Sequence, residues 1–89
     1  MLYIVSYDLK PPTQRYVELR NKIKEFPSWA VLGESVFLIE TNLTAAEVRD
    51  ELGEFIDGND RIFVGKICAP AAWKGYSEEI TNWIKTKFK

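Results

Sequence analysis

The chain has 89 residues, of which 46% are hydrophobic and 28% charged, and its formal net charge is −1. These values are typical of one small globular domain, residues 1–89, and exclude a disordered chain or a strongly basic one. The sequence contains no histidine and a single cysteine, Cys68. A zinc site, a Cys–His nucleophile pair and an internal disulfide are therefore excluded, and any bound metal would be a hard ion with oxygen ligands.

The first apolar run, Leu2–Tyr7, is too short for a secretory signal peptide or a membrane span, and it stops at Asp8. We therefore expect a cytoplasmic protein with no membrane-spanning segment. The charges are unevenly distributed, since residues 1–24 are basic, residues 25–60 acidic and residues 61–89 basic again. Basic ends around an acidic middle permit a local phosphate-binding surface.

Leu2–Tyr7 carries apolar or aromatic side chains at both alternating sets of positions, which predicts a strand covered on both faces. One cover would be helices, and the second could be another subunit. Residues 13–26 follow two prolines and precede Pro27, and they predict the first helix from apolar residues at helical spacing: Tyr16, Leu19, Ile23 and Phe26. Two strands follow, at residues 29–32 and 35–41, and the break at Gly33-Glu34 is either a tight hairpin or a glycine bulge within one bent strand.

The second helix has the clearest local signal, because Thr44 and Glu47 have the spacing of a capping box and Gly58 suits its C-terminal end. A final strand is expected at residues 61–69, ended by Pro70. A last helix should begin after Ser77, with one apolar stripe: Ile80, Trp83, Ile84 and Phe88. The order predicts the α+β class, a ferredoxin-like βαββαβ sandwich with an extra C-terminal helix.

Asp8, at the end of the first strand, has two interpretations. It is either a turn residue before a proline-bearing loop or a metal-binding and catalytic carboxylate at the rim of the sheet. A single aspartate is a poor magnesium site. A two-fold dimer could bring a second Asp8 close to the first and supply the missing ligand.

Two groups of residues are candidates for binding nucleic acid. Arg15, Arg20 and Lys22 on the first helix either form a solvated face or contact a phosphate backbone. In the stretch AAWKGYS, Trp73 and Lys74 suit base stacking beside a phosphate contact, although a tryptophan there could equally pack over the open edge of the core.

Several short patterns together resemble the CRISPR-associated Cas2 (Cas-two) family, above all its stand-alone relatives, often called SinR-like or Cas-two-like proteins. The patterns are a strand ending in Tyr7-Asp8, a later strand carrying Ser35-Val36-Phe37, and the segments LTAAEVRDEL and AAWKGYSEE. The resemblance covers nearly the whole chain. It implies a homodimer with the two sheets packed face to face, which would give the first strand its second cover.

The resemblance also implies a function. Asp8 matches the family's strand-end aspartate, which lies near its dimer mate and is associated with magnesium, or with manganese in its place. The chain would then be a metal-dependent endonuclease acting on RNA or DNA, with Arg15 and Arg20 as assisting catalytic residues. The alternative is a non-catalytic dimer, a scaffold or adaptor that binds nucleic acid or a protein partner.

Overall fold

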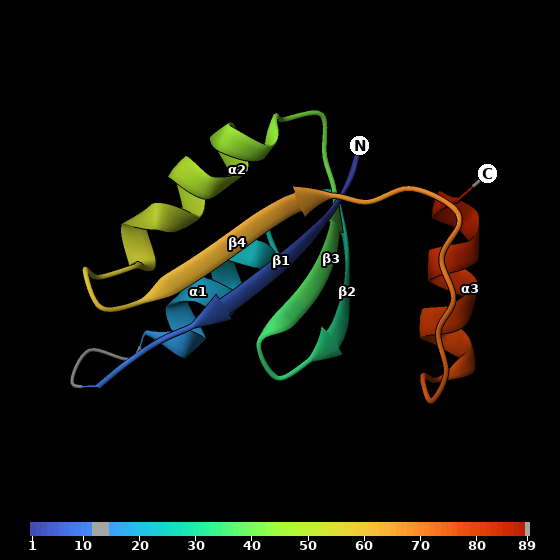
Figure 1. Ribbon diagram of the computed structural model, residues 1–89, viewed down its shortest axis with the longest axis horizontal. Helices are drawn as coiled ribbons and strands as arrows, with labels where there is room; N and C mark the ends of the chain where they lie inside the picture. Colours follow the sequence, from blue (N-terminus) through green and yellow to red (C-terminus); the bar gives the residue numbers. More distant parts are fainter. Residues whose placement is uncertain (12–14, 89) are drawn as a thin grey trace.

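The computed structural model describes residues 1–11 and 15–88 of the chain (Figure 1). Its helices and strands, in chain order, are β1 (Leu2–Asp8), α1 (Tyr16–Ile23), β2 (Ser28–Gly33), β3 (Val36–Glu40), α2 (Ala45–Leu52), the 3-10 turn η1 (Gly53–Phe55), β4 (Arg61–Lys66) and α3 (Glu78–Lys87). None of the described helices combines the length and the hydropathy that a membrane-crossing segment needs.

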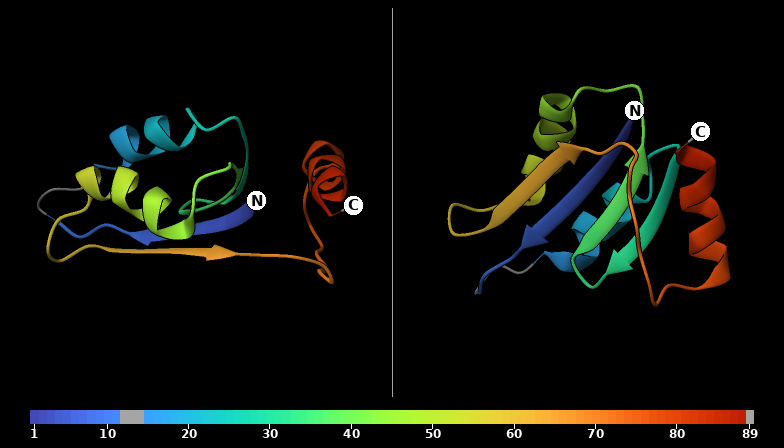
Figure 2. Two further views of the ribbon diagram at one scale, coloured as in Figure 1. Left: turned by 90° about the horizontal axis from the view of Figure 1, so that it is seen from above. Right: turned by 45° about the vertical axis from the view of Figure 1, so that its right-hand side comes forward.

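The four strands form one antiparallel sheet in the order β2-β3-β1-β4, so that β1 lies between β3 and β4. Helices α1 and α2 both lie on one side of this sheet, which we call the first face (Figure 2, left). The arrangement belongs to the α+β class and is compatible with the predicted ferredoxin-like fold.

The main core lies between the first face and these two helices. Alternate residues of β1, namely Tyr3, Val5 and Tyr7, are buried there against apolar side chains of α1 and α2 that are fully buried: Leu19, Ile23, Val48 and Leu52. Burial of each such side chain contributes about 1.5–3 kcal/mol. This core therefore fixes the direction of β1 and the position of its last residue, Asp8.

The opposite side of the sheet, the second face, is covered only in part. Helix α3 packs Ile84 against Leu2 and Leu38, which lie at one end of β1 and in β3. Two polar contacts hold the helix there, since Trp83 Nε1 donates to Ser28 Oγ at 2.9 Å and Lys87 Nζ lies 2.9 Å from Glu40 Oε1. We call the part around Leu2, Leu38 and Ile84 the covered half.

The other part of the second face, around Ser6 and Asp8 of β1 and Arg61 and Phe63 of β4, is the open half. No described helix or strand lies over it (Figure 2, left). The Phe63 side chain is 64% exposed there, although it stands on a sheet. The prediction that β1 has covers on both faces is thus met at its start by α3, whereas its end at Asp8 has a bare second face.

The local signals at helix starts are confirmed. Thr44 and Glu47 form the complete capping box, with N–H···O distances of 2.9 and 3.1 Å, and Ser77 Oγ accepts a hydrogen bond from the Ile80 N–H. Strands β2 and β3 are two separate strands of a hairpin, and a register shift between Val31 and Gly33 shows that a bulge is present as well. The hairpin interpretation is therefore confirmed, whereas the alternative of one bent strand was wrong.

Three predicted boundaries were wrong. Helix α2 ends at Leu52 rather than near Gly58, because the chain tightens at Gly53 into the turn η1. Strand β4 ends at Lys66 rather than at residue 69, because its partner β1 begins at Leu2 and offers no further pairing beyond Ile67. Helix α1 begins at Tyr16 and stops at Ile23, and residues 12–14 of its predicted start lie outside the described residues.

Candidate functional site

Asp8 is the last residue of β1, and its side chain points to the open half of the second face. It shares this face with Ser6, because alternate residues of a strand lie on the same side. The Asp8 carboxylate is 51% exposed, and its Oδ2 lies 2.8 Å from Lys10 Nζ. Asp8 is therefore an accessible carboxylate with one ion-pair partner.

The chain just after Asp8 is fastened to the turn that precedes β4. Asp60 Oδ1 accepts a hydrogen bond from the Lys10 backbone N–H at 2.7 Å, and Asp60 Oδ2 accepts one from the Asp57 N–H at 2.8 Å. These two bonds, the one from Lys10 first, hold the pKa of Asp60 below its ordinary 3.8, because they favour the charged carboxylate. Asp60 thereby positions both Lys10 and the start of β4.

Strand β4 contributes two side chains to the open half. Arg61 stands directly opposite Asp8 in the β1–β4 pairing, and Phe63 stands opposite Ser6, so each pair lies on one face. The Phe63 ring lies over Gly65, since a Cβ at residue 65 would be only 2.7 Å from Phe63 Cε1. The open half therefore combines an acid, a base and a flat aromatic ring.

The predicted bases of α1 lie on the other side of the sheet. Arg20 Nε donates to the Tyr7 hydroxyl at 3.3 Å, and the same guanidinium donates to the Glu34 carbonyl. Arg15 contacts the Glu54 carbonyl at 3.1 Å and stacks over the Phe55 ring at 4.9 Å.

Lys22 of α1 pairs with Glu25 at 3.5 Å. Arg20 and Lys22 lie on α1 and Arg15 is its N-cap residue, and all three side chains have partners within the chain. The structure does not bring them to the open half with Asp8.

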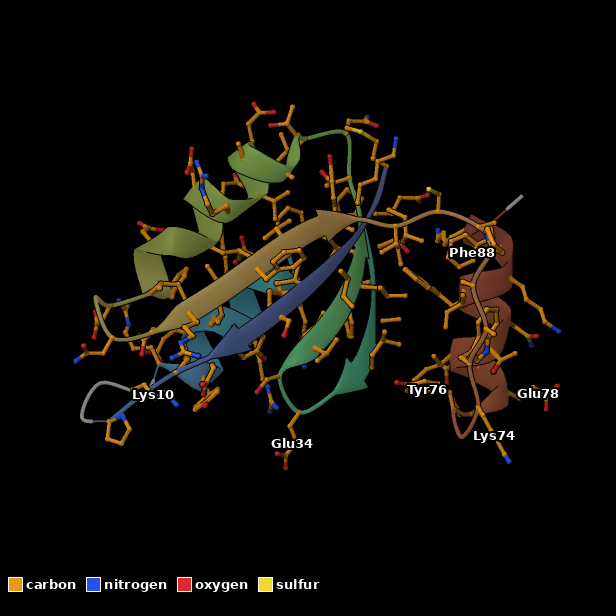
Figure 3. The ribbon with its side chains drawn as sticks, viewed as in Figure 1. Lys10, Glu34, Lys74, Tyr76, Glu78 and Phe88 are labelled. Atoms are coloured by element: carbon orange, nitrogen blue, oxygen red, sulfur yellow. The ribbon has the colours of Figure 1, made fainter. Side chains whose placement is uncertain are left out.

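Trp73 and Lys74 lie in the connection between β4 and α3, far from Asp8 along the sheet. The Trp73 indole N–H donates to Thr81 Oγ1 at 3.2 Å, and its ring stacks on Phe88 with centroids 6.5 Å apart. Lys74 is exposed at the rim of a shallow depression of about 450 Å³ between this connection and α3. Figure 3 shows Lys74 at one end of the molecule and Lys10 at the other.

A metal ion would need more ligands than one chain supplies at Asp8. Among the described residues there is no group of three histidine, cysteine, aspartate or glutamate side chains that could hold an ion. Asp8 offers one carboxylate, which is already paired with Lys10. The residues of a single copy do not fit magnesium, so the ligand set is complete only with a contribution from outside the chain.

Residues 1–74 match the family model described as CRISPR associated protein Cas2. The chain belongs to this family. The Cas2 match contains the whole sheet, α1 and α2, and with them Asp8 and the open half. Helix α3 lies outside the residues that match, so the covered half of the second face is made partly by a segment that the Cas2 match does not include.

The structure adds three residues to the site that the sequence did not single out: Lys10, Arg61 and Phe63. The pairing of β1 with β4 is the feature that gathers them around Asp8. The predicted ferredoxin-like strand order already contained this signal, because an antiparallel β1–β4 pair sets the first residues of β4 opposite the last residues of β1.

Proposed function

We propose that this Cas2 family protein works as a homodimeric, metal-dependent endonuclease on RNA or DNA, and that the open half joins the two copies. The observation that carries the proposal is the position of Asp8, an exposed carboxylate at the rim of a bare sheet face beside an exposed Phe63. A second copy is the occupant that suits this face best. The patch presents the exposed Phe63 ring on an uncovered sheet face, and a two-fold rotation would cover it with the same patch of the second copy while Asp8 and Arg61 stay at its rim.

Magnesium or manganese would be held by Asp8 from each copy, with water completing the oxygen ligands. Such an ion supplies Lewis-acid chemistry, since it lowers the pKa of a bound water and offsets charge on a phosphate. Lys10 would have to leave the Asp8 carboxylate when the ion binds, and its half-exposed side chain is free to rotate into solvent. The pairing of two copies therefore serves both to cover Phe63 and to complete the ligand set.

The role of the chain's own residues is to bind and orient. Asp8 would hold the attacking water by accepting its hydrogen bond, because it is an exposed carboxylate at the proposed metal site. Arg15 and Arg20, proposed as assisting catalytic residues, would reach a bound phosphate only after leaving their partners Glu54 and Tyr7. Their support for catalysis is weaker than that of Asp8 for this reason.

A non-catalytic dimer that binds nucleic acid or a protein is the second candidate. The Asp8–Lys10 ion pair favours it, because a carboxylate already neutralised by a lysine makes a weaker metal ligand. In this alternative, Arg15, Arg20, Lys22, Trp73 and Lys74 contact the nucleic acid and Asp8 is a structural residue. Such binding would weaken steeply with rising salt.

The test is cleavage of labelled RNA and duplex DNA with magnesium or manganese, comparing the wild type with Asp8→Ala. Asp50→Ala is the matched control, because Asp50 is an exposed aspartate on α2 that forms an ion pair with its neighbour Arg49. All three proteins must sediment as folded particles of equal size. Cleavage that needs the metal and Asp8, and survives Asp50→Ala, supports the nuclease. Equal cleavage by all three, or none, favours the binding dimer.

A further inference from the structure

Arg61 is a cation at the candidate site whose side chain has no partner among the described residues. It lies opposite Asp8 in the β1–β4 pairing, its side chain is exposed, and it makes no hydrogen bond, ion pair or ring contact with any described residue. Arg15 and Arg20, by comparison, are both held by carbonyl, hydroxyl or aromatic groups within the chain. Arg61 would break no contact within the chain when it binds an external anion, and it is therefore the best suited of the three arginines to do so.

The surroundings of Arg61 fix its backbone but leave its head group free. The pairing with β1 holds one side of the residue, and Asp60, its neighbour, is tied by two hydrogen bonds to Lys10 and Asp57. The Asp60 carboxylate is directed at backbone N–H groups and so is not the partner of Arg61. The free end of the Arg61 side chain is therefore presented from a rigid strand at a constant place beside Asp8.

A nucleic acid that reaches Asp8 brings a negative phosphate toward a negative carboxylate, and this approach needs a positive charge nearby. Without a metal ion, Lys10 Nζ lies 2.8 Å from the Asp8 carboxylate, so it offsets this carboxylate rather than the incoming phosphate. Arg61 supplies the remaining charge, and its planar guanidinium can donate two parallel hydrogen bonds to phosphate oxygens.

We propose that Arg61 binds a backbone phosphate of the nucleic acid beside Asp8 and so sets where the nucleic-acid strand lies at the rim of the proposed dimer face. The proposal rests on the proposed function for its substrate class, since it takes RNA or DNA as the ligand. It does not depend on cleavage or on a metal. It assigns the phosphate contact to β4 rather than to α1, and it requires no rearrangement of the contacts that hold Arg15 and Arg20.

The experiment measures binding of a labelled single-stranded RNA and a labelled duplex DNA to the full chain in EDTA, where metal-dependent cleavage is absent. Arg61→Gln should weaken binding about threefold to tenfold at low salt, equally for unrelated sequences. The slope of the logarithm of the binding constant against the logarithm of the salt concentration should become shallower by about the value of one phosphate contact. Arg61→Lys should keep the slope and lose part of the affinity, because a lysine keeps the charge but not the paired hydrogen bonds. Arg49→Gln is the control, since Arg49 is an exposed arginine paired with Asp50 on α2.

A substitution at Arg61 also alters the border of the proposed dimer face. A second measurement therefore detects the contact between Arg61 and the phosphate in the wild-type protein. The side-chain Nε–Hε signal of Arg61 in wild-type protein, assigned by its loss in Arg61→Gln, should shift when the same RNA is added, while the signal of Arg49 stays. An unmoved Arg61 signal, equal binding by the Arg61 and Arg49 variants, or no binding by the wild type at low salt would each overturn the proposal. Absence of cleavage with Arg61-dependent binding would overturn only the nuclease.

Discussion

The covered half and the open half of the second face belong to the same strands and have different partners. Leu2 and Leu38 in the covered half are 6% and 2% exposed, because Ile84 of α3 packs against them. Phe63 in the open half is 64% exposed on a neighbouring strand. On the second face, β1 is apolar at Leu2, where α3 covers it, and polar at Ser6 and Asp8, where no described element covers it, so Phe63 of β4 is the exposed apolar exception.

The two halves also differ in how they relate to the residues that match the Cas2 family model. The open half lies entirely within the match, while the helix that covers the other half lies beyond it. Polar contacts also differ, since α3 is held by Trp83 and Lys87, whereas the open half presents Asp8 and Arg61 at its rim. One half is therefore a core, whereas the other is an exposed aromatic surface bordered by two charged side chains.

The largest effect is expected on the free energy of unfolding, from a substitution in the covered half. Ile84→Ala should lower the free energy of unfolding by about 2–5 kcal/mol, because it removes a side chain that is 3% exposed and leaves a cavity beside Leu38. Urea unfolding followed by tryptophan fluorescence measures it. Asn82→Ala, an exposed position of the same helix, should change the value by less than about 0.5 kcal/mol. Equal values for the two variants would mean that α3 is not part of the core.

The next largest effect is expected on the dissociation constant of the proposed dimer, from a substitution in the open half. Phe63→Glu should raise the dissociation constant of the proposed dimer about tenfold or more, because it places a charge at the centre of the apolar contact. Its monomer should unfold at nearly the wild-type urea concentration. Val17→Glu is the control, since Val17 is 67% exposed on α1, on the other side of the sheet. Sedimentation velocity distinguishes them, and a dimer that tolerates Phe63→Glu would show that the open half is not the interface.

Gly65→Ala tests the same surface more gently. The added Cβ would lie 2.7 Å from Phe63 Cε1, so the ring must move away from its place over the strand. We expect weaker dimerisation than in the wild type but stronger than in Phe63→Glu. The free energy of unfolding should change by less than about 1 kcal/mol, because a strand accepts alanine and the ring is free to rotate. Unchanged dimerisation would indicate that the position of the ring has no role.

The smallest effect is expected on the pH dependence of stability, from a substitution of Asp60, which accepts hydrogen bonds beside the open half. Its pKa is lowered in the folded chain by hydrogen bonds from the Lys10 and Asp57 N–H groups. A group with a lowered folded pKa stabilises the fold above its unfolded value, near 3.8, and this contribution is lost as the pH falls through the folded value. Asp60→Ala should therefore be slightly less stable than the wild type at neutral pH, and the gap should close under acid. Thermal unfolding across this range measures the gap, and a pH-independent gap would contradict the assignment.

Local signals in the sequence predicted the local structure well. Thr44 and Glu47 lie within one helical turn, and Ser77 caps the helix that follows it, so each start depends on a few adjacent residues. Gly58 was wrong as a helix end because the turn at Gly53 came first. The end of β4 could not be predicted from β4 alone, since it is set by where β1 begins.

The candidate site depended on long-range pairing and was predicted only in part. Asp8 stood out because a charge followed an apolar run, and a resemblance supported it. In the sequence, nothing distinguishes Arg61 as a functional residue, and only its pairing opposite Asp8 makes it a candidate. The apolar stripe of α3 was evident, but nothing in its spacing indicates which half of the sheet it covers.

The connection of α3 to β4 through residues 67–77 has a consequence for how the protein behaves on dilution. Because the helix is tethered, it meets the covered half at an effective local concentration that does not change with the amount of protein. The second copy of the proposed dimer would obey mass action instead and would dissociate below its Kd. Experiments at nanomolar and at micromolar protein would then sample different species, folded alike in the core and differing only in whether Asp8 faces water or its counterpart.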